Sequence, residues 1–307
     1  MNFSTFNFKS YVATLLALVA LTCLAGLAAT EWLVRARVEP TDQFPVHLQL
    51  FHAAQERNAS FGDSHAACGF YPPAGMVNLA FPGENNDNMK YKARIYFGKR
   101  SPQHVIVQAD AHMFARYRSA ATRGYNESFD QAPNEQSAFS VRTLSSYHRP
   151  KLFAYWKVWL LKGGFESRTK LSSNGWIECT DRWLSVAPET RKTLARERAI
   201  LHEPAEDFLH SDSATAYERL LQELLHKGAQ VCMVEFPVTP EYQQAVPQAS
   251  YQAVRAWFAT QAQRFSLRYL AHAGAYADRP DLFSDMDHLN AQGAREFSQR
   301  IVRECFE

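Results

Sequence analysis

The chain has 307 residues, of which 46% are hydrophobic and 21% are charged, an ordinary balance for a protein that buries a core. The formal net charge is only +2 and no Lys/Arg stripe interleaves with aromatic residues, so the composition argues against a nucleic-acid-binding protein. The length suggests one large domain or two small ones.

The first predicted element is an apolar helix near the N-terminus, within residues 1–33. Residues 12–29 contain no charged side chain, which is close to the minimum length of roughly 17 residues for spanning a bilayer. We expect a single-pass anchor, because the stretch is long for a signal-peptide core and Trp32 offers an interfacial ring. A cleaved signal peptide, cut near residues 26–29, and a buried core helix are the alternatives.

A linker and an alternation of strands and helices follow. Residues 34–55 contain two prolines and are predicted to link the anchor to a domain at 56–307. The expected strands lie at 58–61, 76–81, 104–109, 229–238 and 266–270, and the expected helices at 214–226, 248–264 and 291–303. Strands that alternate with helices predict an α/β fold with a parallel sheet covered on both faces.

The stretch from about 114 to 209 departs from this alternation and is predicted to be an insertion. It is polar in places and contains an aromatic run, KLFAYWKVWLLKGG, at 151–164. We expect this run to form a helix packed on the core. A glycan platform or a membrane-surface face is the alternative, because Trp and Tyr suit both.

The five cysteines show neither a CxxC pair nor zinc spacing with histidine. Cys23 lies in the apolar segment, which leaves four for the globular part. If that part lies outside the cytoplasm a disulfide is expected, for instance one with Cys179, although the pairing does not follow from the sequence. Cys68 is interpreted as a small packed residue.

The first candidate for chemistry is the sequence FGDSHAACG at 61–69. Ser64 follows a predicted strand, and in open α/β folds ligands bind where strands end. The small residues after it can begin a helix, whose N-terminal N–H groups stabilise an oxyanion. A serine hydroxyl needs a base and a group that orients the base. Its neighbour His65 is interpreted as a surface side chain, with substrate binding as the alternative.

The candidate base lies near the C-terminus, in LFSDMDHLNAQG at 282–293. Asp285 and His288 are three residues apart, so on a tight turn the carboxylate can hold the imidazole Nδ1–H and leave Nε2 for the serine. Asp287 is a rival for the orienting role, but a direct neighbour of His288 is expected to point elsewhere. Asn290 is predicted to cap the last helix.

Together, Gly-Asp-Ser near the start and Asp-x-x-His-Leu-Asn near the end resemble the signature of the SGNH (GDSL-like) hydrolases. Residues from about 58 to 306 fit that layout. The chain looks most similar to the membrane-anchored relatives that act in cell-envelope acylation, such as the alginate O-acetylation proteins and the D-alanyl transfer protein of teichoic acid synthesis. The resemblance implies a flavodoxin-like three-layer α/β/α fold, with Ser64 as nucleophile, His288 as base, Asp285 as orienter, and no metal or cofactor.

The resemblance also implies an oxyanion hole made by the Ser64 N–H, a glycine N–H in a second block and an Asn side chain in a third. The second block is matched by NLAFPGENN at 78–86, where Gly83 is the glycine. The third block reads VIVQADAHMF at 105–114 and has no Asn in the expected place. The candidates for oxyanion or substrate binding are therefore Gly83, Asp63, Gln108, Asp110 and His112. This departure argues against an ordinary free-standing esterase but not against the fold.

Other hydrolase classes fit less well. The Gly-x-Ser-x-Gly elbow of α/β-hydrolases is absent because residue 66 is Ala, and no carboxylate/His cluster typical of a metal hydrolase recurs.

We expect serine-dependent acyl transfer to, or ester hydrolysis on, a cell-envelope polysaccharide, with acetyl as the favoured acyl group. The expected location is the cytoplasmic (inner) membrane with the catalytic domain in the periplasm or outside the cell, and a membrane-bound O-acyltransferase is the expected acyl supplier. The alternative is an inactive glycan-binding or scaffold domain.

Overall fold

The computed structural model describes residues 8–98, 100–119, 123–130, 141–145, 147–165 and 171–307. The chain divides into two compact units, one of residues 1–46 with 134–169 and one of residues 47–133 with 170–307. The predicted insertion at about 114–209 is therefore shared between the units. The predicted boundaries at residues 33 and 55 stay predictions, and the predicted linker carries a helix, α2 (Gln43–Ala53).

The second unit is built on a parallel sheet of five strands. The strands are β1 (Asn58–Phe61), β2 (Met76–Asn78), β3 (His104–Gln108), β4 (Gln230–Glu235) and β5 (Arg268–Ala271). Their order in the sheet is β2-β1-β3-β4-β5, and every neighbouring pair is parallel. This is the doubly wound order of flavodoxin-like folds. The prediction of an α/β fold with a central parallel sheet is confirmed.

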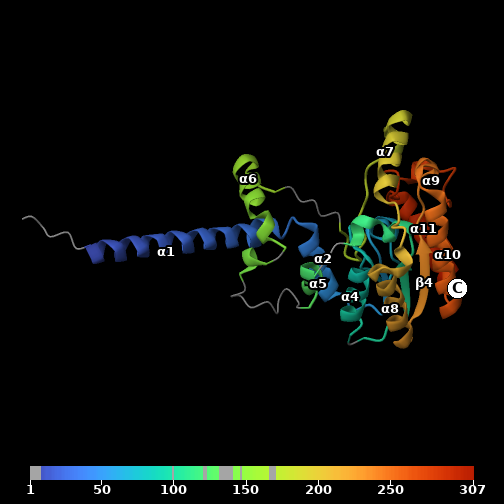
Figure 1. The fold of residues 1–307 in the computed structure, drawn as a ribbon, viewed down its shortest axis with the longest axis horizontal. Helices are drawn as coiled ribbons and strands as arrows, with labels where there is room; N and C mark the ends of the chain where they lie inside the picture. Colours follow the sequence, from blue (N-terminus) through green and yellow to red (C-terminus); the bar gives the residue numbers. More distant parts are fainter. Residues whose placement is uncertain (1–7, 99, 120–122, 131–140, 146, 166–170) are drawn as a thin grey trace, which may run out of the picture. The chain divides into compact units, whose positions relative to one another are not determined.

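Helices cover both faces of this sheet. They are α3 (Ser64–Gly69), α4 (Asn86–Tyr96), α8 (Asp212–His226), α10 (Gln248–Phe265) and α11 (Ala291–Phe306). The unit also contains α5 (Arg123–Glu127), which contacts α4, and α7 (Pro188–Leu201), which packs against α9 (Pro240–Ala245). The chain leaves β1 through α3 toward β2 and then reverses direction through α4, α8 and α10. Because parallel crossovers are right-handed, the reversal puts α3 on the opposite face from those three helices. Helix α11 packs against α3. Helix α4 packs beside α8 (Figure 1).

Local sequence explains where these elements begin and what they bury. Helix α8 presents Tyr217, Leu220 and Leu224, at helical spacing, to the core, and all three are buried. The predicted cap of the last helix is confirmed, because the Asn290 side chain accepts hydrogen bonds from the N–H groups of residues 292 and 293.

Two disulfides tie distant parts of the second unit together. Cys68 in α3 is bonded to Cys179, and Cys232 in β4 is bonded to Cys305 in α11. The expected involvement of Cys179 is confirmed. Cys68 is packed in the core, as interpreted, and it is also disulfide-bonded, which the sequence did not predict.

The first unit contains α1 (Phe8–Leu33), a π-helical turn (Val34–Val38) and α6 (Leu152–Lys162). Within the described part of the chain, one helix is long and apolar enough to cross a membrane, and it is this N-terminal one. The aromatic run forms the helix α6, but the expectation that it packs on the core is wrong, since none of its residues is buried. It belongs to the small unit that includes α1 rather than to the sheet (Figure 1).

Candidate active site

The candidate nucleophile lies at the point where the sheet changes direction. Strands β1 and β3 are neighbours, and the direction of winding reverses between them. In open α/β sheets, ligands bind at the carboxyl ends of the strands at such a switch point. Ser64 begins α3 just beyond the end of β1. Gly62 in the intervening turn has no room for a side chain, because a Cβ there would lie 2.3 Å from Gln108 Oε1. The turn therefore depends on glycine to bring the serine against β3.

His288 is held in the orientation that a catalytic base needs. Both carboxylate oxygens of Asp285 lie 2.9 Å from His288 Nδ1, and Oδ1 also accepts the backbone N–H of His288. Across the described residues, His288 Nε2 is buried without a hydrogen-bond partner. This geometry fixes the tautomer and leaves Nε2 for a hydroxyl proton.

The segment after β1 and the segment before α11 meet at this site. His65, the residue after Ser64, has its ring centroid 5.2 Å from that of His288. The part of the chain that the structure describes shows no hydrogen bond between Ser64 Oγ and His288 Nε2. Without substrate, such bonds are often long or misaligned and tighten in the substrate complex.

Asp287 also faces the candidate base, and the expectation that it points elsewhere is wrong. Its Oδ1 lies 3.3 Å from His288 Nδ1, and its Oδ2 lies 3.3 Å from His65 Nε2. Burial alone lowers the pKa of His288, but the carboxylates of Asp287 and Asp285 raise that pKa well above its ordinary value. Both carboxylates therefore lie on the Nδ1 side of the imidazole, that of Asp285 half-exposed and that of Asp287 fully buried.

His65 is buried, so its interpretation as a surface side chain is wrong. Its Nδ1 lies 2.9 Å from Asp110 Oδ2, while Nε2 faces Asp287. Burial alone lowers the pKa of His65, but the hydrogen bonds to Asp110 and Asp287 raise it to about 9. At neutral pH His65 is therefore a buried cation between two carboxylates.

Asp63 stabilises the turn of residues 62–64 between β1 and α3, called the serine turn below. Its side chain accepts the backbone N–H of His65 at 2.9 Å and is fully buried. Its Oδ2 also forms a hydrogen bond with His112 Nε2, at 2.8 Å, and accepts a hydrogen bond from the guanidinium of Arg118. Burial alone raises the pKa of Asp63, but Arg118 and then His112 hold it well below its usual range. The aspartate before the nucleophile is thus a buried anion with its charge compensated.

Two backbone N–H groups are available for an oxyanion. In the described residues, neither the Ser64 N–H nor the Gly83 N–H has a hydrogen-bond partner. Gly83 has a φ of +83°, a conformation that favours glycine. These are the two backbone donors that the sequence predicted, and their role stays a prediction.

The structure places the three side-chain candidates of the third block around the serine turn. Gln108 donates its amide hydrogens to Asp63 and Asp110, and its oxygen accepts the Asp63 N–H at 2.8 Å. Asp110 accepts from His65 and from the Phe236 N–H. With His112 also bonded to Asp63, all three stabilise the turn. Their direct contact with an oxyanion or a substrate stays a prediction.

Sequence reasoning missed His202 and Arg118, which lie in the predicted insertion without a motif. In the described part of the chain, His65, His112 and His202 come close enough together to share a metal ion. Each of the three has a hydrogen-bond partner. Both ring nitrogens of His65 face carboxylates, and His112 Nε2 is bonded to Asp63. His202 Nδ1 lies 2.8 Å from the hydroxyl of Tyr242. These hydrogen bonds tie the cluster to the turn that carries Ser64 and to Tyr242.

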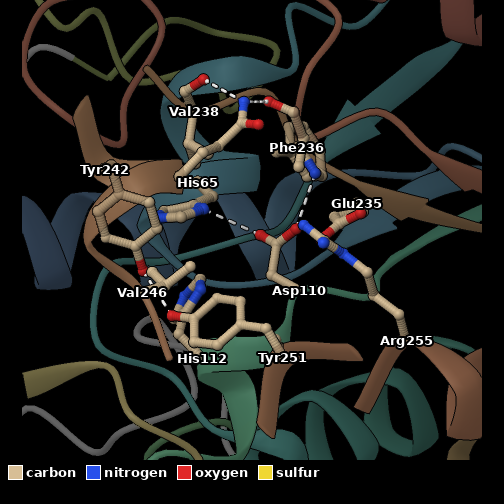
Figure 2. A pocket seen from close by; sticks show the side chains of 13 residues that line it. His65, Asp110, His112, Glu235, Phe236, Val238, Tyr242, Val246, Tyr251 and Arg255 are labelled. Atoms are coloured by element: carbon tan, nitrogen blue, oxygen red, sulfur yellow. Dashed lines mark hydrogen bonds and ion pairs between the residues drawn. The ribbon is translucent and has the colours of Figure 1, made fainter. Parts of the chain in front are cut away.

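A small cavity lies beside this cluster (Figure 2). Its volume of about 20 Å³ leaves room for about one water molecule. Figure 2 shows the Asp110 carboxylate directed toward His65 and Arg255 beside Glu235. Burial raises the pKa of Glu235 to about 7, although Arg255 opposes the shift. The cavity is too small for an acyl substrate.

The charge on His65 is expected to make stability depend on pH. Its pKa of about 9 in the folded protein lies above the ordinary value of 6.5, so the stabilisation is complete below pH 6.5 and is lost as pH rises through 9. We expect His65→Gln to lower the free energy of unfolding at pH 6 by on the order of 3 kcal/mol more than at pH 9.5. Urea unfolding of both proteins at the two pH values checks this. Parallel pH profiles for the two proteins would show that His65 is not charged in the folded state.

Comparison with known proteins gives distant structural likenesses. No family model matches the chain, and no curated protein matches it. The fold is similar to that of a lipase/acylhydrolase from Enterococcus faecalis, with a TM-score of 0.42 and 12% identity over 81% of this chain and 95% of that one. It is also similar to that of a putative acylhydrolase from Bacteroides fragilis, with a TM-score of 0.39 and 11% identity over 84% of this chain and 93% of that one.

Proposed function

We propose that the second unit is a serine-dependent acyl esterase or acyltransferase with Ser64, His288 and Asp285 as its catalytic residues. The observation that carries the proposal is the buried, unpartnered Nε2 of His288, in the described residues, whose Nδ1 is fixed by Asp285. The residue beside Ser64 packs against that imidazole. A base oriented in this way, in contact with the residue that follows a serine at the switch point of a parallel sheet, supports acyl transfer.

The chemistry proceeds through an ester on Ser64. The Ser64 hydroxyl attacks the acyl carbonyl carbon while His288 Nε2 takes its proton, and the N–H groups of Ser64 and Gly83 receive the developing oxyanion. Collapse of the tetrahedral intermediate breaks the bond to the donor alcohol, which leaves with the proton from His288. An acceptor hydroxyl, from water or from a sugar, then loses its proton to His288 and attacks the ester carbonyl carbon. The bond from that carbon to Ser64 Oγ breaks, and Ser64 leaves with the proton from His288.

The anchor and the disulfides support a place for this chemistry at the outer face of the cytoplasmic membrane. The N-terminal helix is apolar and long enough to span, and the two disulfides suit an oxidising compartment. Within the proposal, the acyl group is acetyl, the acceptor or donor is a cell-envelope polysaccharide, and a membrane-bound O-acyltransferase supplies the acyl group.

Labelling with a fluorophosphonate tests the proposal. We expect the full-length protein to gain one adduct by intact mass, because the probe reacts with an activated serine. Ser64→Ala and His288→Ala should both abolish the adduct, and Ser185→Ala, which changes an exposed serine, should leave it unchanged. A folded wild-type protein that gains no adduct would contradict the proposal and favour a glycan-binding scaffold.

A further inference from the structure

Helix α6 exposes apolar side chains around much of its surface. Its sequence, LFAYWKVWLLK, contains no buried residue. Phe153, Leu160 and Leu161 have exposed fractions of 82%, 70% and 74%. A soluble protein rarely leaves such a concentration of apolar surface in water, and where it does, the surface usually contacts a partner or a membrane.

The helix is attached to the end of the apolar segment of α1. Trp156 Nε1 donates a hydrogen bond to Thr30 Oγ1 at 3.2 Å, and the rings of Trp159 and Trp32 meet edge to face with their centroids 6.2 Å apart. Thr30 directly follows the uncharged stretch that ends at residue 29. Within the first unit, α6 therefore lies beside the level at which α1 leaves the apolar region (Figure 1).

The segment before α6 is fixed to the same end of α1. The carboxylate of Glu31 accepts the backbone N–H groups of Arg142 and Thr143, each at 3.0 Å. Glu39 pairs with the Arg142 guanidinium, and Tyr147 donates to Asp42 at 2.9 Å. These bonds hold the start of α6 at a defined distance from the spanning helix rather than on a free tether.

The composition of α6 matches a bilayer interface. Trp and Tyr rings prefer the headgroup level of a membrane, and three tryptophans and Tyr155 gather here. The stretch from 149 to 165 contains Arg149, Lys151, Lys157 and Lys162 and no acidic residue. Lysine stems can lie along apolar surface while their ammonium groups reach anionic lipid headgroups.

We propose that α6 lies in the headgroup region of the membrane as a second attachment beside α1, with its exposed apolar side chains in contact with lipid. The inference rests on α1 spanning the membrane and does not depend on the chemistry at Ser64. A bilayer accounts for both features, because its apolar interior accepts Phe153, Leu160 and Leu161 and its anionic headgroups accept the lysines. Two attachments stop the first unit from rotating about the axis of α1.

Fluorescence quenching in the full-length protein tests this inference. The protein is reconstituted in vesicles of phosphatidylcholine and phosphatidylglycerol and labelled with an environment-sensitive fluorophore on one free cysteine. Native Cys23, in the spanning helix, is the deep reference. Leu160→Cys in a Cys23→Ser background reports on α6, and Leu209→Cys in the same background is a matched leucine of the second unit, 54% exposed.

We expect the label at residue 160 to be quenched by lipids that carry a spin label near the headgroup and to be shielded from aqueous iodide several-fold more than the label at 209. The label on Cys23 should be quenched by lipids that carry the spin label deep in the chain. Iodide quenching at 160 equal to that at 209, with Cys23 still in lipid, would overturn the inference and leave the anchor intact. Shielding of 160 from both quenchers would overturn it in favour of a protein partner.

If Cys23 itself escapes the lipid quenchers, the anchor fails and the inference fails with it. Fluorophosphonate labelling of Ser64 in the Leu160→Cys variant provides an independent readout of the second unit. That labelling should match wild type whichever result the quenching gives, so failure of this inference and failure of the proposed function are distinguishable.

Discussion

Replacing Asp285 and Asp287 together with asparagine is expected to lower kcat for hydrolysis of an activated acetyl ester by about 10⁴-fold, with little change in KM. Both carboxylates face His288 Nδ1, at 2.9 Å and 3.3 Å. An amide in their place can hold the wrong tautomer and does not stabilise the imidazolium that forms when Ser64 loses its proton. Because either carboxylate can orient the ring, we expect each single variant to lose much less than the double variant, with Asp285→Asn the more harmful of the two.

The pH dependence separates this role from a structural one. The carboxylates raise the pKa of His288, and activity needs the deprotonated imidazole, so the acid limb of the profile of kcat/KM against pH should move to lower pH when they are removed. Asp281→Asn is the matched control, because this exposed aspartate of the neighbouring turn pairs with Arg279 rather than with the site. A single Asp285→Asn variant as inactive as the double variant would show that Asp287 takes no part.

Arg118→Met is expected to lower the free energy of unfolding by about 3–5 kcal/mol. Its guanidinium is buried, pairs with the fully buried Asp63 and donates to the backbone carbonyl of Glu84. Removing one partner of a buried ion pair leaves an uncompensated charge, which costs far more than the loss of a surface pair. Glu84 directly follows Gly83, whose N–H is the second candidate oxyanion donor. Arg118 therefore connects the serine turn to the loop that contains Gly83.

Urea unfolding of the full-length protein in detergent measures the effect, with Arg264→Met as the control. Arg264 is exposed and pairs with Glu218 at 3.3 Å, so its loss should cost about 1 kcal/mol or less. Adding Asp63→Asn to Arg118→Met should recover part of the loss, because it removes the unpaired charge. An Arg118→Met protein within about 1 kcal/mol of wild type would contradict the assignment of a compensated buried anion.

Local patterns in the sequence are enough to predict much of the second unit. Apolar runs bounded by turn residues predicted five strands, and all five are present. Strand β2 ends at Asn78 rather than at residue 81, and β4 ends at Glu235 rather than at residue 238. Asn290 follows a short-range capping rule and caps α11. The Asp285–His288 contact needs only a three-residue turn, so its spacing was informative without knowledge of the fold.

The other features depend on residues that only folding brings together. His65 and Asp287 are 222 positions apart, so no spacing rule relates them, and the burial that charges His65 exists only in the folded chain. Arg118 lies in a stretch without a motif. Cys68 and Cys179 are 111 positions apart, so their pairing depends on the fold that brings the two segments together. The aromatic run at 151–164 predicted a helix correctly, because helix formation is local. Whether that helix is buried was decided by the unit to which it packs, and α6 packs beside the end of α1.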